Sequence, residues 1–180
     1  IILTALAVVK EREGGTMEQL IVTPIKPFEL LLGKIIPFTI LSFFDVILVI
    51  VIGTAWFRIP LVGSPLLLLL CSSLFLLSTL GLGLFISTIS ETQQQAMITS
   101  FMILFPSMLL SGFIFPIENM PKVIQYLTYL LPPRYFIVIV RGIFLKGIGI
   151  NYLINEIWPL ALFGIIIFSM SVARFRKRLA

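Results

Sequence analysis

The most constraining feature of this chain is a long stretch, Pro65 to Ile89, that contains no charged side chain. A membrane-spanning helix needs about 20 apolar residues to cross about 30 Å of hydrocarbon. Three further stretches are comparably apolar, namely 30–54, 96–115 and 152–173. Their residues do not alternate with period 2, and open strands in lipid would leave backbone groups unpaired. The sequence therefore predicts an all-α polytopic membrane protein with four full spans.

Composition supports this class. The 180 residues are 59% hydrophobic and only 12% charged, whereas soluble domains carry about 25% charged residues. Such a chain is too apolar for intrinsic disorder and too poor in charge to cover the surface of a water-soluble globule. The single cysteine, Cys71, excludes an intrachain disulfide, and the lack of histidine excludes a histidine-based metal site or catalytic base.

The first apolar run, 1–9, is too short to span, because nine helical residues extend roughly 13 Å. Lys10 follows it at once. We expect it to be the inner end of a partial span, with the sequence a fragment of a longer protein. The rival interpretation, a cleaved signal peptide, lacks a basic region before the run and a cleavage site after it.

Lysine and arginine predict the orientation, because they concentrate on the cytoplasmic side of membrane proteins. Eight of the 13 basic residues belong to 10–29, to Lys34 or to the tail 174–180. We therefore expect 10–29 and the C-terminus to be cytoplasmic. The basic residues lie between apolar runs, so they indicate topology and not nucleic-acid binding.

The opposite side holds 116–151, which is too apolar for a plain loop. Pro121 favours the start of a helix that Pro132–Pro133 ends, and a second helix over 134–146 stops at Gly147. At 13 residues the second helix reaches only about 20 Å. We expect both helices to be interfacial or re-entrant at the outer surface.

The most informative polar stretch is 10–24. Gly14 and Gly15 break the preceding helix, and Thr16 stands three residues before Gln19, a spacing typical of a capping box that opens a short helix. A short helix with mixed charges on the cytoplasmic face is a suitable shape for a partner's cleft. The alternative is a solvated loop with an interfacial helix.

Asp45 lies inside a predicted span, where an ionisable group costs several kcal/mol unless it is paired or hydrated. It lines a pathway or an inter-helix contact, or it reaches a polar partner such as Ser42. No phosphate-binding loop, nucleophile elbow or zinc-protease motif is present, so a membrane-embedded transferase or protease is poorly supported. Any energy for transport must come from another subunit.

Several segments of the chain together resemble the ABC-2 type permeases, which are the membrane subunits of bacterial exporters. The segments that carry this resemblance are 11–25, 29–35, 93–96, 110–117, 120–121, 133–136 and 141–147. The resemblance implies an ABC-2 permease bundle, here one transmembrane domain over 1–180 that holds the end of the second of six spans and the four that follow. It also implies a multi-pass location in the bacterial plasma membrane. It implies a second permease copy or paralogue, and a cytoplasmic ATPase that binds ATP and Mg²⁺, with no cofactor on this chain.

The resemblance further implies the site residues. No catalytic residue is expected, and export would move drug-like, lipid or other amphipathic molecules. Three positions match the outer re-entrant region, Arg134, Arg141 and Lys146. The match to the coupling segment that rests on the ATPase comprises Glu11, Arg12, Glu13, Gly14, Gly15, Thr16 and Glu18. The alternatives are an ATP-independent channel or secondary transporter, and an inactive fragment.

Overall fold

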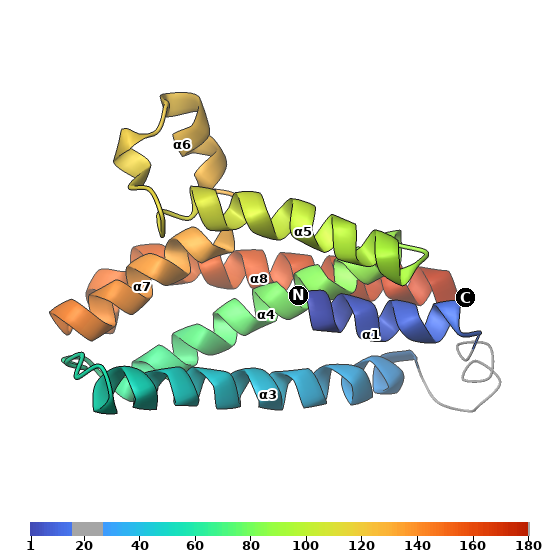
Figure 1. The fold of residues 1–180 in the computed structure, drawn as a ribbon, viewed down its shortest axis with the longest axis horizontal. Coiled ribbons are helices and arrows are strands. Elements are labelled where there is room, and N and C mark those ends of the chain that lie inside the picture. The colour runs from blue at the N-terminus through green and yellow to red at the C-terminus, as the bar shows by residue number, and fades with distance from the viewer. Residues whose placement is uncertain (16–26, 180) are drawn as a thin grey trace.

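The computed structural model describes residues 1–15 and 27–179, and every regular element within these ranges is a helix (Figure 1). The predicted all-α class is therefore confirmed. The helices in chain order are α1 (Ile2–Glu13), α3 (Pro27–Ala55), α4 (Pro65–Ile89), α5 (Gln93–Leu110), the 3-10 helix η1 (Ile117–Asn119), α6 (Lys122–Thr128), α7 (Pro132–Lys146) and α8 (Ile150–Leu179).

Three of these helices, α3, α4 and α8, are long and apolar enough to cross a membrane, and the bent pair α6 and α7 raises that number to four if it counts as one span. The boundaries of α4 are those predicted, because its ends are chemically marked. Ser64 accepts a hydrogen bond from the backbone N–H of Leu67, and Pro65 occupies the first turn, where its missing N–H costs nothing.

Helix α5 corresponds to the predicted span 96–115 but has different ends. It begins at Gln93, where the Thr92 hydroxyl caps it by accepting from the N–H of Gln95, and it stops at Leu110. Gly112 follows with φ of 84°, a left-handed conformation that turns the chain away from the helix axis. At 18 residues, α5 is about 27 Å long.

The segment between α5 and α8 contains the two predicted α-helices, α6 and α7, which meet at an angle of 82°, and also the 3-10 helix η1. The second, α7, begins at Pro132 and not after the proline pair, because proline fits the first turn of a helix. It ends at Gly147, whose φ of 62° is the left-handed conformation expected at a helix C-terminus.

The centre of the bundle is the pair α4 and α8, with α1 and α3 against one side and α5 across the top of Figure 1. Glycines allow this close approach. A Cβ atom at Gly81 would lie 3.0 Å from the backbone nitrogen of Phe168, and one at Gly164 would lie 2.9 Å from the Ser78 hydroxyl. The Ser171 hydroxyl donates to the Gly81 carbonyl at 2.8 Å. These glycines therefore allow α4 and α8 to pack closely, as small residues commonly do in membrane helices.

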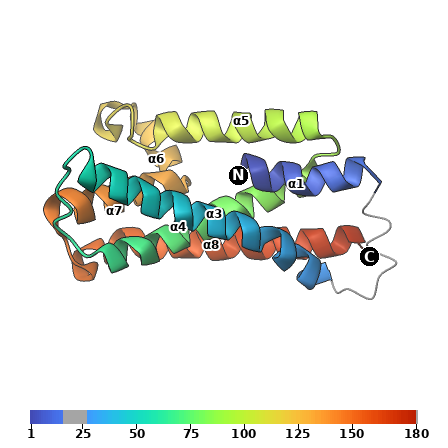
Figure 2. The same cartoon turned by 60° about the horizontal axis from the view of Figure 1, so that its bottom comes forward.

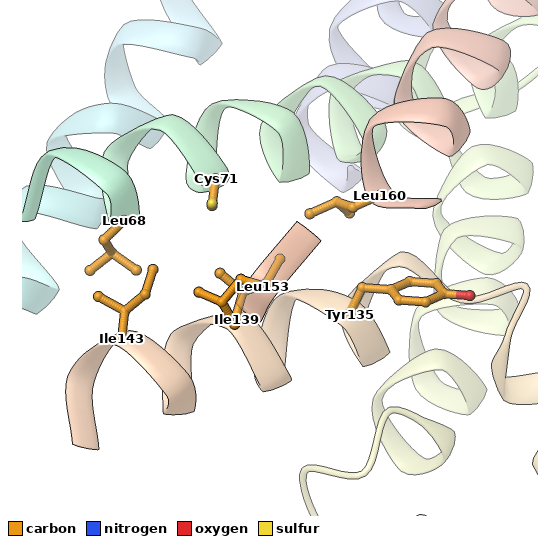
Figure 3. Packing of buried hydrophobic residues seen from close by; sticks show 7 residues of the cluster. All are labelled: Leu68, Cys71, Tyr135, Ile139, Ile143, Leu153 and Leu160. Carbon is orange, nitrogen blue, oxygen red and sulfur yellow. The ribbon is translucent and has the colours of Figure 1, made fainter. Parts of the chain in front are cut away.

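An apolar cluster packs helix α7 against the central pair α4 and α8 (Figure 3). Its side chains come from α4, α7 and α8, and they are Leu68, Cys71, Tyr135, Ile139, Ile143, Leu153 and Leu160. The loop before α4 adds backbone contacts, because the N–H groups of Val62 and Gly63 donate to the carbonyls of Phe144 and Ile143 at 3.2 and 3.0 Å. Two otherwise unpaired carbonyls at the end of α7 are thus satisfied.

Candidate functional site: the end of α1 and its contacts

Three consecutive charged residues at the end of α1 contact three different helices. Glu11 forms an ion pair with Lys34 of α3. Arg12 donates from Nη2 to the backbone carbonyl of Ser87 in α4, at 3.2 Å. Glu13 accepts two hydrogen bonds at Oε2 from Gln93 of α5, one from the backbone N–H at 3.0 Å and one from the side-chain amide at 2.9 Å. The end of α1 is therefore a junction of four helices.

The position of α1 explains this arrangement. Buried Ala5 and Val9 pack against Ile86 of α4 and Ala96 of α5, so α1 lies among the other helices (Figure 2). Successive residues of an α-helix point about 100° apart. Three adjacent side chains at the end of a surrounded helix therefore reach three different neighbours.

The Glu13 carboxylate also suits its place electrostatically. Gln93 is the first residue of α5, and a negative charge is favourable at a helix N-terminus, where free N–H groups point outward. Glu13 is exposed, and the hydrogen bonds from the Gln93 backbone and side chain lower its pKa. The ionised form, which accepts both bonds, is the one that this contact stabilises.

Gly14 and Gly15 end α1, as the sequence predicted. Gly15 has φ of 69°, so its backbone is left-handed, and no atom lies within 4 Å of the place where a Cβ would be. Glycine is required here by backbone conformation and not by crowding. Thr16 and Glu18, the other two residues of the predicted coupling segment, lie outside the described residues.

Sequence reasoning missed the partners at this junction. Lys34 was interpreted as a topology signal and as part of the family resemblance, and Gln93 only as part of that resemblance. A lysine near the start of an apolar run, close to a loop that contains acidic residues, is the one signal that pointed to such a pair. Nothing in the sequence singled out Ser87, which contributes its backbone carbonyl.

The three predicted outer residues do not form one cluster. Arg134 links α7 to α6, since its Nη1 donates to the Thr128 hydroxyl and its guanidinium lies 3.7 Å from the centre of the Tyr129 ring. Arg141 donates to the Gly112 carbonyl at 3.4 Å, beyond the end of α5. Lys146 is exposed in the last turn of α7.

Asp45 lies on an exposed part of α3 and makes no hydrogen bond or ion pair with another residue in the described part of the chain. The contact with Ser42 that the sequence allowed is therefore absent within that part.

Residues 1–145 match the family model described as "ABC-2 type transporter". The chain belongs to the ABC-2 type transporter family. It is 38% identical over 177 residues to "Probable multidrug ABC transporter permease YbhR" of Escherichia coli K12, covering 98% of this chain and 48% of that protein. It is 44% identical over 165 residues to "Probable multidrug ABC transporter permease YbhS" of the same organism, covering 89% and 43%.

A third relative, "Inner membrane transport permease YhhJ" of Escherichia coli K12, is 32% identical over 183 residues, covering 98% of this chain and 48% of that protein. The chain thus spans about half the length of the curated relatives that it matches. No solved structure gives a significant match. Family membership and three long apolar helices agree that this is a multi-pass membrane protein of the permease class.

Proposed function

We propose that the chain acts as the membrane-spanning permease of an ATP-driven ABC exporter. A separate cytoplasmic ATPase subunit would bind ATP and Mg²⁺, and a second permease copy or paralogue would complete the transporter. The observation that carries the proposal is the junction at the end of α1, where Glu11, Arg12 and Glu13 tie the predicted coupling segment to α3, α4 and α5.

Such a junction is suited to transmit movement. The coupling segment 10–29 would rest on the ATPase, and closure of the ATPase around ATP would displace it. Because its first residues are bonded to three other helices, a displacement acts on all of them at once. A coupling contact changes the membrane part only if it differs between two states of the partner.

The names of the relatives support an exported drug or other amphipathic molecule as cargo. The orientation follows from the charge distribution, with the α1 junction and the C-terminus cytoplasmic and the hairpin of α6 and α7 outside. A bacterial plasma membrane fits the inner-membrane location in the name of YhhJ.

Asp45 belongs to the same proposal. A charged side chain on an exposed part of a spanning helix is stable only beside water or a polar partner. Either the transport pathway or the interface with the second permease copy would supply that environment.

Charge reversal at the junction tests the proposal. In the full-length protein with its ATPase, Glu13→Lys removes both bonds to Gln93 and puts a positive charge at the start of α5. We expect drug efflux to fall about tenfold, since hydrogen bonds to a charged group contribute about 1.5–3 kcal/mol. ATP hydrolysis and membrane insertion are expected to persist. Accumulation of fluorescent drugs in cells and phosphate release by purified protein measure the two activities.

Gly15 offers a matched pair of variants. Gly15→Val forces a branched residue into a left-handed conformation, whereas Gly15→Asn places there a residue that tolerates it. We expect the valine variant to lose coupling and the asparagine variant to keep it. Normal efflux by both Glu13→Lys and Gly15→Val would refute the assignment of this segment as the coupling element.

A further inference from the structure

A cavity of about 550 Å³ lies between α5 and the rest of the bundle. Its walls come from α4, α5, α8, the start of α7 and the first residue of the chain. It is separate from the α1 junction, since none of Glu11, Arg12 and Glu13 lines it. Ligand pockets in proteins measure about 300–1,000 Å³, so this cavity has the size of a site for a small molecule.

Among the described residues that line the cavity, no side chain carries a formal charge, and most side chains are apolar. Two of them, Phe75 of α4 and Phe136 of α7, stack with parallel rings whose centres are 4.2 Å apart. Phe163 of α8 and Leu104 of α5 also line it. An ionic group would lose its hydration here without gaining an opposite charge, which is costly.

The polar side-chain groups in the described walls are hydroxyls whose protons already form hydrogen bonds to backbone carbonyls. Ser107 donates to the Ile103 carbonyl at 2.6 Å, Ser111 to the Met108 carbonyl at 2.7 Å, and Thr79 to the Leu76 carbonyl at 3.1 Å. A hydroxyl has one proton and two lone pairs. Ser107 and Thr79 therefore offer acceptors to a ligand and have no proton left to give.

We propose that this cavity binds a neutral lipophilic small molecule that carries a hydrogen-bond donor, such as an N–H or O–H group. The apolar body would fill the space beside the phenylalanine rings, and its donor would bond to Ser107 or Thr79. Anionic amphiphiles would be disfavoured, because the described walls offer them neither a positively charged side chain nor a free side-chain donor. That the ligand is transport cargo rests on the proposed function, whereas binding itself does not.

Three related fluorescent probes test the chemistry on full-length protein in lipid nanodiscs, with empty nanodiscs subtracted and no nucleotide present. N-phenyl-1-naphthylamine is neutral and has one N–H, its N-methyl derivative has none, and 8-anilino-1-naphthalenesulfonate adds an anion. We expect saturable binding of the first, and binding of the sulfonate weaker by about tenfold or more, equivalent to about 1.4 kcal/mol.

Two tryptophan variants of α5 locate the site. Leu104→Trp fills the cavity, whereas Met102→Trp places the same ring on an exposed position, since Met102 is 72% exposed. We expect the first to raise the dissociation constant of N-phenyl-1-naphthylamine about tenfold and the second to leave it unchanged. Equal binding by Leu104→Trp and wild type would overturn the location.

The variant Ser107→Ala tests the acceptor. It should weaken N-phenyl-1-naphthylamine about threefold to tenfold, the worth of one hydrogen bond, and leave the N-methyl probe unaffected. Equal losses for both probes, or a preference for the sulfonate, would overturn the proposed ligand class.

Two further outcomes separate this proposal from others. If another part of the full-length protein or a bound lipid occupies the cavity, no saturable binding of N-phenyl-1-naphthylamine appears and the proposal fails. The Glu13→Lys substitution lies outside the cavity, so this variant should bind the probe normally while its efflux falls about tenfold. Normal efflux in this variant and in Gly15→Val, together with normal probe binding, would refute the coupling assignment and leave the binding site standing.

Discussion

The Glu11–Lys34 ion pair links the end of α1 to α3. The lysine side chain is 13% exposed and the glutamate 38%, so solvent screens the pair only in part. The contribution of such a pair lies between that of an exposed pair and that of a buried one, about 1–2 kcal/mol. Removing one partner leaves the other charge in a poorly hydrated place.

We therefore predict that Glu11→Lys and Lys34→Glu each lower the free energy of unfolding by about 1–2 kcal/mol, and that the double exchange recovers most of the loss. A double-mutant cycle on detergent-solubilised protein, unfolded with sodium dodecyl sulfate, measures the coupling. Lys146→Glu is the control, because Lys146 is exposed and makes no bond within the described residues. Additive losses in the cycle would show that the two side chains do not interact.

For each contact at the α1 junction, sequence analysis identified one of the two residues. The charged run at 11–13 stands out in an apolar chain, and Gly14 and Gly15 mark the end of its helix. The partners are distant in sequence, because Arg12 and Ser87 are 75 positions apart and Glu13 and Gln93 are 80 positions apart. Such pairings depend on how whole helices pack, which a local pattern does not encode.

Among the elements, α4 and α8 depend on small residues for their contact. A Cβ at Gly81 would meet the Phe168 backbone at 3.0 Å, and backbone cannot move aside as a flexible side chain can. We predict that Gly81→Val costs about 1–3 kcal/mol, the usual penalty for overfilling a packed interior. The change is measured as a lower thermal unfolding midpoint in detergent.

Gly53→Val in α3 is the matched control, because no atom lies within 4 Å of its Cβ position. Both variants place the same residue in a long apolar helix, so differences in helix propensity cancel. Equal midpoints for the two variants would show that the α4–α8 contact does not require glycine.

The helix ends also show which features of the fold can be predicted from the sequence. The start of α4 follows from Ser64 and Pro65, whose preferences are local. The end of α5 was misjudged because the turn at Gly112 lies inside an apolar run, where hydropathy continues although the helix stops. The angle of 82° between α6 and α7 depends on tertiary contacts such as Arg134 with Thr128 and Tyr129, which the sequence did not reveal.

For the whole molecule, the helices are buried to very different extents. In the apolar window of α4, 39% of residues are buried within this chain, but only 6% are buried in that of α3. Most of the surface of helix α3 is therefore left uncovered by the described residues of this chain. Asp45 on this helix makes a purely lipid environment unfavourable along its whole length.

The α1 junction and the pair α6 and α7 lie at opposite ends of the bundle (Figure 1). The α1 junction, with the turn between α4 and α5 beside it, is at one end, and the hairpin of α6 and α7 is at the other. If α4 crosses the membrane, a residue in the turn after it and a residue in the hairpin must face opposite compartments. Glu91 and Lys122 are exposed and occupy these two places.

We predict that, after Cys71→Ser, a cysteine at Lys122 reacts with a membrane-impermeant thiol reagent added to intact cells. A cysteine at Glu91 should react only after permeabilisation. The positive-inside bias predicts that the 10–29 segment and the basic tail are cytoplasmic, and the turn between α4 and α5, which contains Glu91, lies at the same end of the bundle as the end of α1. The parent without cysteine controls for labelling of other groups. The reverse pattern would invert the molecule and put the proposed coupling segment out of reach of ATP, whereas labelling of both sites in intact cells would mean that α4 does not cross the membrane.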